Sequence, residues 1–240
     1  MSLENASALL RQAKRIAVLT GAGISAESGV PTFRGADGLW KQYRAEDLAT
    51  PRAFTRDPEL VWQWYDWRRN VIAQVKPNAG HLALAEIEKR TAQFTLVTQN
   101  VDGLHQQAGS HSVVELHGSI WTLRCVGCGN EWFGRKVPLV MPPHCECGGM
   151  ARPGVVWFGE NLAPQVWNSA ERAVQSCDVL LVIGTSAIVY PAAGLVPLAR
   201  SCGTKTIEIN VEPTPVSGFV DCALTGRAGE ILPRLIAATT

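Results

Sequence analysis

The chain has 240 residues, of which 46% are hydrophobic and 18% charged, enough apolar material for the core of one large or two small globular domains. Its formal net charge is +1, so the composition indicates no general attraction to nucleic acid or to an anionic membrane. No apolar run reaches the roughly 18 residues of a membrane span, and the first residues lack the basic and apolar regions of a secretory signal. We therefore expect a cytoplasmic protein with no specific nucleic-acid partner and no membrane contact.

Buried strands and amphipathic helices alternate along most of the chain. Four apolar runs, each followed by turn residues, predict buried parallel strands. These runs are 16–20, 94–98, 179–183 and 206–210. Helical patterns cover 81–90, 164–175, 191–200 and 228–238. The alternation predicts an α/β fold with a Rossmann-like, doubly wound parallel sheet.

Two stretches break this alternation and are expected to form a smaller lobe. Residues 40–76 are rich in Trp and Arg with a helical pattern, and residues 121–150 hold clustered cysteines among Gly and Pro. The lobe would consist of a helical insertion at 41–76 and a metal-binding module at 121–150. The larger Rossmann-like domain would then comprise 1–40, 77–120 and 151–240.

A glycine-rich turn follows the first predicted strand. Residues 21–26, Gly-Ala-Gly-Ile-Ser-Ala, have the spacing that lets phosphate groups approach the backbone N–H groups at a helix N-terminus. A plain tight turn between strand and helix explains the pattern equally well. A dehydrogenase would show an acidic residue at the end of a second strand about 20 residues later. Residues 28–35 have a loop pattern instead, which disfavours hydride transfer.

A long helix is predicted from Pro58 to Val75, with Asp57 as its N-cap. Six residues form its apolar face: Leu60, Val61, Trp64, Val71, Ile72 and Val75. Arg68 lies near the middle of this face, and Tyr65 lies three residues earlier at its edge. A guanidinium there must extend to solvent or find an anion. An internal Asp or Glu and an acidic group of a substrate are both open as that anion.

Polar residues follow the strand 94–98, where ligands bind in α/β proteins. Residues 99–102, Gln-Asn-Val-Asp, break the strand pattern, and a ligand can supply the partners that buried polar groups need. A further strand at 113–116 leads to His117, a candidate base near a ligand, although a lone histidine is usually structural. The histidines with weaker contexts are expected in caps, loops or on the surface: His81, His105 and His111.

Two other strand ends carry small or polar residues. Residues 184–186, Gly-Thr-Ser, follow one predicted strand, and residues 210–212, Asn-Val-Glu, follow another. Each is a plain turn when taken alone. On one edge of the same sheet, they together favour a nucleotide-binding role.

The sequence contains 7 cysteines, four of which are clustered. Cys125-x-x-Cys128 and Cys145-x-Cys147 would bring four sulfurs to one tetrahedral Zn²⁺, a closed site with a structural role. The second pair has one spacer residue, and the adjoining His144 is an alternative fourth ligand. The scattered cysteines adjoin apolar runs and are expected in the core: Cys177, Cys202 and Cys222.

In combination, these motifs resemble the sirtuin family of NAD-dependent protein-lysine deacylases, and the resemblance covers residues 21 to about 233. The motifs that carry it, besides the cysteine pairs, are 21–25, 31–35, 98–102, 117–118, 155–160, 184–186 and 209–212. The Tyr65-x-x-Arg68 pair resembles the subgroup that removes succinyl and malonyl groups. In that subgroup the pair binds the acyl carboxylate, and a small residue near Ala49 leaves room for it.

The resemblance implies that NAD lies across the sheet edge. The residues implied to bind it are Gly21, Ala22, Gly23, Ile24, Ser25, Glu27, Thr32, Phe33, Arg34, Trp40, Gln99, Asn100, Val101, Asp102, Gly184, Thr185, Ser186, Asn210, Val211, Glu212 and Ala228. The acyl oxygen of a substrate lysine would attack the ribose carbon as nicotinamide leaves, and His117 would act as general base on the ribose hydroxyls. The products would be free lysine, nicotinamide and O-acyl-ADP-ribose.

The implied partners are acylated lysines of protein substrates. The residues implied to contact them are Tyr65, Arg68, Ala49, Val156, Phe158, Gly159, Glu160, Val189 and Tyr190. Segments 155–160 and 189–190 are expected to pair with the substrate backbone as an added strand.

Three other classes of protein remain open from the sequence. An NAD-dependent ADP-ribosyltransferase would transfer ADP-ribose to protein with no acyl group required. A dehydrogenase would transfer a hydride to or from the nicotinamide, which is detected as a change in NADH absorbance. A zinc-stabilised binding module would tolerate the loss of His117.

Overall fold

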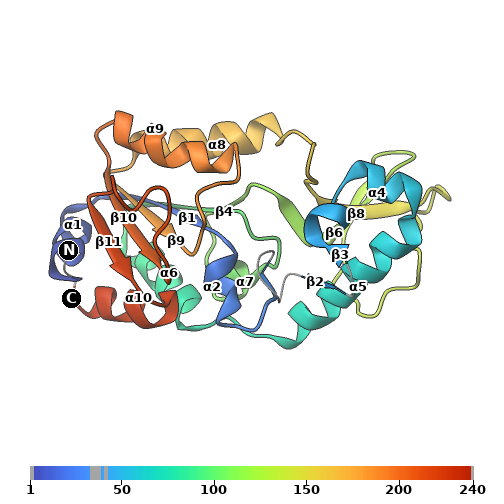
Figure 1. Cartoon of the computed structure of the whole chain (residues 1–240), viewed down its shortest axis with the longest axis horizontal. Helices are drawn as coiled ribbons and strands as arrows, with labels where there is room; N and C mark the ends of the chain where they lie inside the picture. Colours follow the sequence, from blue (N-terminus) through green and yellow to red (C-terminus); the bar gives the residue numbers. More distant parts are fainter. Residues whose placement is uncertain (1–2, 33–38, 41–42, 239–240) are drawn as a thin grey trace.

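A six-stranded parallel sheet forms the larger lobe of the molecule in the computed structural model, which describes residues 3–32, 39–40 and 43–238 (Figure 1). The strands lie in the order β11-β10-β9-β1-β4-β5, and every neighbouring pair is parallel. Their bounds are β1 Arg15–Thr20, β4 Gln93–Thr98, β5 Val113–Glu115, β9 Val179–Ile183, β10 Lys205–Asn210 and β11 Cys222–Thr225. Numbered by chain order, this arrangement is 3-2-1-4-5-6, the doubly wound order of Rossmann folds.

Helices cover both faces of this sheet (Figure 1). On one face lie α1 Leu3–Gln12, α6 Ala79–Arg90 and α10 Ala228–Ala237; on the other lie α8 Pro164–Ser176 and α9 Leu195–Ser201. Side chains of β1 alternate between the two cores that result. Ile16 and Val18 pack in one, and Ala17 and Leu19 in the other. Burial on both faces explains why the strands are continuous apolar runs.

The predicted fold class is confirmed, and the main strands begin within one residue of the predicted bounds. The segment predicted as a helix at 191–200 begins instead as a 3-10 helix, Ala192–Gly194, before α9. Helix α1 and the edge strand β11 were not predicted. Four residues at a sheet edge are too few to show a hydrophobic period.

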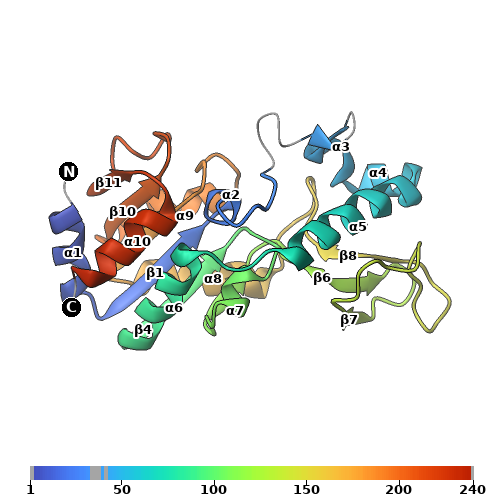
Figure 2. The same ribbon diagram turned by 90° about the horizontal axis from the view of Figure 1, so that it is seen from below.

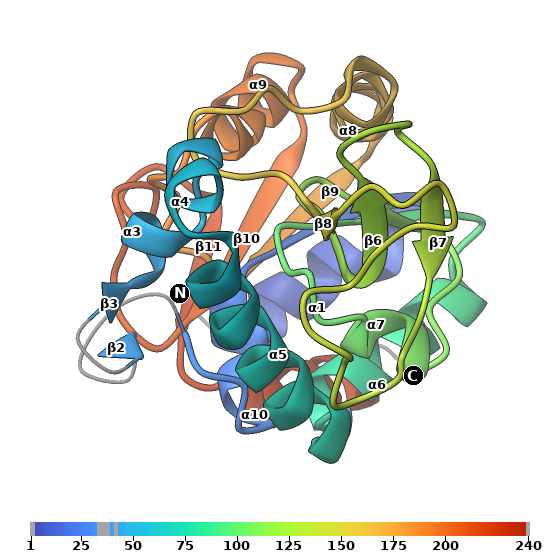
Figure 3. The same cartoon turned by 90° about the vertical axis from the view of Figure 1, so that its right-hand side faces the viewer.

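The smaller lobe contains a three-stranded antiparallel sheet and a group of helices (Figure 3). The sheet order is β7-β6-β8, with β6 Gly118–Cys125, β7 Glu131–Phe133 and β8 Ala151–Val155. The accompanying elements are the hairpin of β2 Leu39–Trp40 and β3 Tyr43–Arg44, and the helices α3 Ala45–Leu48, α4 Pro51–Arg56 and α5 Pro58–Gln74. Four buried tryptophans dominate the core of this lobe: Trp62, Trp64, Trp121 and Trp157.

Helix α5 matches the predicted helix and is capped as expected, because the Asp57 side chain accepts a hydrogen bond from the Leu60 N–H at 2.9 Å. Its buried face also includes Arg69, which the apolar pattern missed. The Arg69 guanidinium donates to the carbonyls of Ile120 (2.5 Å) and Gly134 and lies 4.9 Å from the centre of the Trp121 ring. Arg69 therefore fastens α5 to the small sheet.

Two short helices lie on the side of the larger lobe that faces the smaller one, α2 Ala22–Ala26 and α7 Leu104–Gln107 (Figures 1 and 2). The chain passes from α5 in the small lobe to α6 in the large lobe along the same side (Figure 2). None of the described helices is both long and apolar enough to cross a membrane.

The scattered cysteines differ in their surroundings. Cys177 and Cys222 are buried, as predicted, but Cys202 is exposed. Cys202 follows the last residue of α9 and forms its C-cap. The expectation of a core position was therefore wrong for Cys202, because the apolar run beside it ends with the helix.

Candidate active site

The ends of β1 and β9 meet at the point where the strand order of the sheet reverses. The Gly21 N–H donates to the Ile183 carbonyl at 3.0 Å, and the Gly23 N–H donates to the Gly184 carbonyl at 2.8 Å. A Cβ atom on Gly23 would lie 2.8 Å from the Cα atom of Gly184, whose φ is +58°. Glycine is thus needed at both positions for the two turns to touch. Open α/β sheets bind nucleotides at such a reversal.

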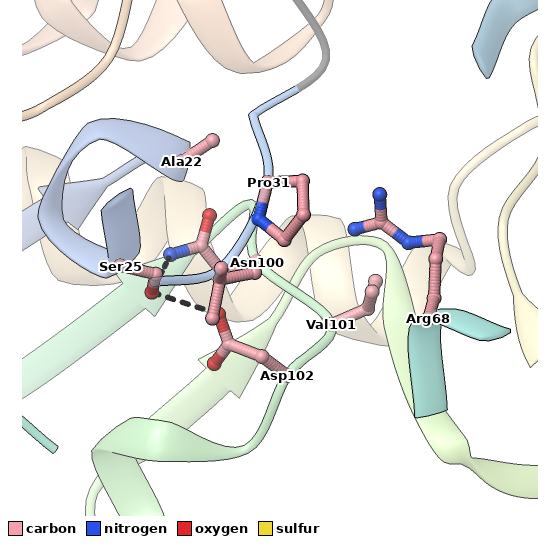
Figure 4. A pocket seen from close by; sticks show the side chains of 8 residues that line it. Ala22, Ser25, Pro31, Arg68, Asn100, Val101 and Asp102 are labelled. Atoms are coloured by element: carbon pink, nitrogen blue, oxygen red, sulfur yellow. Dashed lines mark hydrogen bonds between the residues drawn. The ribbon is translucent and has the colours of Figure 1, made fainter. Parts of the chain in front are cut away.

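Ser25, Asn100 and Asp102 form a buried polar cluster beside this turn (Figure 4). The Ser25 hydroxyl donates to an Asp102 carboxylate oxygen at 2.7 Å, and the Asn100 amide donates to Ser25 Oγ at 3.1 Å. Burial raises the pKa of Asp102, while hydrogen bonds from the Leu104 N–H and from Ser25 act against that rise. Residues from two separate sequence motifs therefore meet in one rigid arrangement.

Two histidines lie close to this cluster, and for His105 the expected cap, loop or surface position is wrong, because it is buried in α7. His81 belongs to the capping box of α6, as a cap residue would, but it is also fully buried and its Nε2 atom lies 3.4 Å from Ser25 Oγ. The His105 ring is buried 4.8 Å from the His81 ring. Burial lowers the pKa of His81 to about 4 and that of His105 well below its usual value, so both are neutral at pH 7. His111 is exposed, as expected.

His105 also begins a chain of hydrogen bonds that the sequence analysis missed. Its Nε2 atom lies 3.0 Å from the Thr20 hydroxyl, which donates to the Thr98 hydroxyl at 2.8 Å. The Thr98 oxygen in turn accepts from the Asn100 N–H at 3.0 Å. The two threonines are the last residues of the neighbouring strands β1 and β4. Their position at strand ends was the one sequence feature that could have marked them as part of the site.

His117 lies two residues after the end of β5, next to the buried Leu116. Its position allows it to act as a base. Its Nδ1 atom lies 2.9 Å from the Gln99 carbonyl, which can only accept a hydrogen bond. Nδ1 therefore carries the proton, and Nε2 keeps its lone pair. Burial lowers the pKa of His117, and the bond to Gln99 opposes this change to a smaller extent. The imidazole is consequently neutral at pH 7, the form that a general base requires.

The remaining strand ends join the same edge of the sheet. The Gln99 amide donates to Thr185 Oγ1 at 2.9 Å, and the Asn210 amide donates to the Thr185 carbonyl at 2.8 Å. Ser186 is half-buried, whereas Val211 and Glu212 are exposed. The predicted residues at the ends of β4, β9 and β10 are thus in direct contact.

The other residues implied to bind a cofactor differ in where the structure places them. Ala22 and Val101 line the cavity beside the polar cluster, while Ile24 is fully buried in the core, so only its backbone is available. Glu27 accepts a hydrogen bond from the Gly229 N–H at 3.1 Å and ties α2 to the start of α10 at Ala228. Thr32 is half-buried; Phe33, Arg34 and the Trp40 side chain lie outside the described residues.

Arg68 lines the same cavity from the side of the small lobe (Figure 4). The cavity is lined by Ala22, Ser25, Val30, Pro31, Arg68, Asn100, Val101 and Asp102. Burial lowers the pKa of Arg68, and the carboxylate charge of Asp102 opposes that change. Asp102 is therefore an internal carboxylate whose charge acts on Arg68.

The segment that follows β8 is tied to both lobes. The Val156 N–H donates to the His117 carbonyl and the Phe158 N–H to the Ala49 carbonyl, each at 2.9 Å. Glu160 is not a free substrate contact, because its carboxylate accepts from both terminal nitrogens of Arg152, at 2.6 and 2.8 Å. An added substrate strand would therefore have to use the remaining backbone groups of this segment. Gly159, Val189 and Tyr190 lie on accessible surface, with Tyr190 76% exposed.

The four clustered cysteines converge at the far end of the small lobe. All four Sγ atoms lie within 4.8 Å of one another, with separations of 3.5 Å for Cys125–Cys147 and 3.8 Å for Cys128–Cys145. Four thiolates around Zn²⁺ at 2.3 Å are about 3.8 Å apart, so the arrangement fits zinc. The His144 ring instead lies 2.8 Å from the Pro142 carbonyl. Hydrogen bonds from the backbone N–H groups of Cys128 and Gly127 to the Cys125 sulfur lower the pKa of that thiol.

The doubly wound sheet and the buried polar cluster at its reversal point define a Rossmann-type α/β protein, with a small lobe whose four cysteines could bind zinc. The sequence profile of the Sir2 family matches residues 21–191. The chain belongs to the Sir2 family.

Individual relatives match nearly the whole chain. The NAD-dependent protein deacylase 2 of Pyrobaculum aerophilum is 54% identical over 233 residues, which cover 97% of this chain and 94% of the relative. The NAD-dependent protein deacylase of Aquifex aeolicus is 52% identical over 222 residues, covering 92% and 93%. A solved Sir2 homolog–NAD complex has a TM-score of 0.94 at 47% identity, covering 98% of this chain and 93% of that one. A Sir2–p53 peptide–NAD⁺ complex has a TM-score of 0.89 at 31% identity, covering 99% and 98%.

Proposed function

We propose that this chain is an NAD-dependent protein deacylase that removes acyl groups from lysine side chains of protein substrates. The products would be free lysine, nicotinamide and O-acyl-ADP-ribose. The observation that carries the proposal is the position of His117, whose Nε2 lone pair is set by the Gln99 carbonyl at the nucleotide-binding edge of the sheet. Relatives named NAD-dependent protein deacylases support it.

Each group at the sheet edge has a role in this proposal. NAD supplies the ribose carbon from which nicotinamide leaves and to which the acyl oxygen of the lysine adds. Asn100 and Asp102, fixed by Ser25, offer hydrogen-bonding groups to the nicotinamide amide. His117 Nε2 accepts the proton of a ribose hydroxyl, which makes that oxygen a nucleophile. The residues implied to bind NAD would hold it at this edge of the sheet, and the four clustered cysteines would hold a zinc ion that stabilises the small lobe.

Succinyl and malonyl groups are proposed as substrates together with acetyl. Arg68 supplies a buried positive charge at the cavity, and Tyr65 lies one helical turn earlier on α5. An acyl carboxylate would form a charge-assisted hydrogen bond with Arg68, which an acetyl group cannot do. Ala49, buried at the end of α3, is a small side chain beside this region.

Mass spectrometry of acetyl-, succinyl- and malonyl-lysine peptides, incubated with and without NAD, tests the proposal. We expect loss of the acyl mass only when NAD is present. Persistence of every acyl group, or loss that does not need NAD, would contradict it. Transfer of ADP-ribose to a protein that carries no acyl group would favour the alternative, an NAD-dependent ADP-ribosyltransferase that uses the same cleft.

A further inference from the structure

Trp157 makes a direct side-chain hydrogen bond to Tyr65 between two elements far apart in the sequence. Its indole Nε1–H donates to the Tyr65 hydroxyl oxygen at 2.9 Å, and both side chains are only 3% exposed. An indole N–H is a donor only, so the direction of this bond is fixed. The bond joins α5, which carries Arg68, to the segment that follows β8.

The Trp157 ring is itself fixed by charged groups. The Arg152 guanidinium carbon lies 3.4 Å from the ring centroid, and Arg152 is paired through both terminal nitrogens with Glu160. Glu160 also accepts from the backbone N–H of Trp157 at 2.8 Å. On the helical side, the Phe54 ring packs against the indole with a centroid separation of 5.3 Å. These contacts define the direction in which the indole N–H points.

The bond has a consequence for the hydroxyl hydrogen of Tyr65. With its oxygen accepting from Trp157, the hydroxyl must direct its own hydrogen elsewhere. Neither the indole N–H nor the Arg68 guanidinium can accept that hydrogen. Burial raises the pKa of Tyr65, so the phenol keeps its proton at neutral pH. Tyr65 and Arg68 are then two donors on one face of α5, a pattern complementary to a group with two acceptor oxygens.

We propose that Trp157 is a positioning residue for recognition of acidic acyl groups, because its N–H occupies the Tyr65 oxygen and turns the Tyr65 O–H toward the acyl carboxylate. This inference rests on the proposed function and adds a residue that does not itself touch the substrate. It gives the Arg152–Glu160 pair a purpose as well, since the pair fixes the indole rather than contacting substrate.

The test compares Trp157→Phe, Tyr65→Phe and the double variant on one peptide carrying either succinyl- or acetyl-lysine. Phenylalanine keeps an aromatic ring beside Arg152 but removes the N–H donor together with part of the buried ring volume, so the comparison between the two acyl groups separates the lost bond from the lost packing. We expect Trp157→Phe to lower kcat/KM for the succinyl peptide about fivefold more than for the acetyl peptide, the effect of one neutral hydrogen bond of average strength. The loss should lie in KM, because the acyl carboxylate is remote from the reacting carbonyl.

Coupling between the two residues decides whether Trp157 acts through Tyr65. In the Tyr65→Phe background, Trp157→Phe should change the succinyl kcat/KM by less than about twofold. Trp62→Phe is the matched control, because its buried indole N–H donates to the Ala151 carbonyl at 2.8 Å instead of to Tyr65. Any loss in that variant should be equal for the two acyl groups.

Equal losses on both acyl groups in Trp157→Phe, or additive losses in the double variant, would overturn the inference. A chain that removes neither acyl group with NAD would overturn the proposed function instead. In that case, dissociation constants of fluorescein-labelled succinyl- and acetyl-lysine peptides still decide the role of Trp157. A selective weakening for the succinyl peptide supports it, and equal weakening contradicts it.

Discussion

His117 is the residue on which the proposed chemistry depends. We expect His117→Ala to fold and bind NAD but to lower deacylation at least roughly a hundredfold, the usual loss on removal of a general base. The matched control is His111→Ala, an exposed histidine outside the cleft, which should keep full activity. Steady-state kinetics and NAD titration measure both. Near-normal turnover in a folded His117→Ala protein would rule out the assignment.

The pH dependence of the rate follows from the same residue. Because burial lowers the pKa of His117 below 6.5, the imidazole is neutral and active at pH 6.5 and above. The acidic limb of a plot of kcat/KM against pH should therefore have its midpoint below 6.5. A midpoint clearly above that value would mean that another group controls the rate.

Arg68 determines the choice of acyl group in the proposal. Arg68→Met should lower kcat/KM for a succinyl-lysine peptide by about 1.5–3 kcal/mol, the range for a hydrogen bond to a charged group. Acetyl-lysine gains nothing from the guanidinium, so its turnover should change little or rise. The ratio of the two kcat/KM values is the measurement. An equal loss on both substrates would assign Arg68 a structural role, with Asp102 as the charge that acts on it.

His81 and His105 should make folding sensitive to acid. Their pKa values are lowered in the folded state, so the unfolded chain binds more protons as the pH falls below 6.5. The free energy of unfolding should decrease from pH 6.5 toward pH 4, by at most about 1.4 kcal/mol per pH unit for each histidine. Urea titrations at a series of pH values give the slope of the free energy of unfolding against pH. This slope should be shallower for His81→Asn and unchanged for His111→Asn. Identical slopes in all three proteins would contradict this account.

At the scale of elements, the cysteine module should depend on metal. The four sulfurs are spaced as four ligands of one zinc are, and the closed arrangement leaves no position for a catalytic water. We expect one zinc per chain, and we expect Cys125→Ser/Cys128→Ser to lose the metal, the ordered small lobe and the activity together. Elemental analysis and circular dichroism measure this. Full activity in a zinc-free protein would show that the metal is dispensable.

The predicted elements show what a sequence pattern can and cannot reveal. Long apolar runs predicted the central strands, and the Asp57 cap predicted the start of α5, because these signals are local. Arg69 was missed because the carbonyls that satisfy it belong to β6 and to the turn at Gly134. The burial of His81 and His105 likewise depends on partners from other strands and helices. The pairing of Glu160 with Arg152 likewise could not be recognised, because nothing local in the sequence marks Arg152 as its partner.

At the scale of the whole molecule, the strand order brings the dispersed motifs together. The ends of β1, β4, β9 and β10 lie on one edge of the parallel sheet, which explains why motifs from residue 21 to residue 210 meet there. The small lobe adds Arg68 to the cavity, and the segment after β8 is bonded to the His117 carbonyl through the Val156 N–H. Local motifs could therefore predict that polar residues gather at one edge of the sheet. The bonds among them could be known only from the fold.

The most direct test of the central claim is the mass of the nucleotide product formed with an acylated peptide and NAD. Acyl transfer within this cleft predicts ADP-ribose that carries the acyl group, in equal amount to the deacylated lysine and the released nicotinamide. With a succinyl peptide, the product should carry the succinyl mass. Free ADP-ribose together with an intact acyl-lysine, or ADP-ribose attached to protein, would contradict the account.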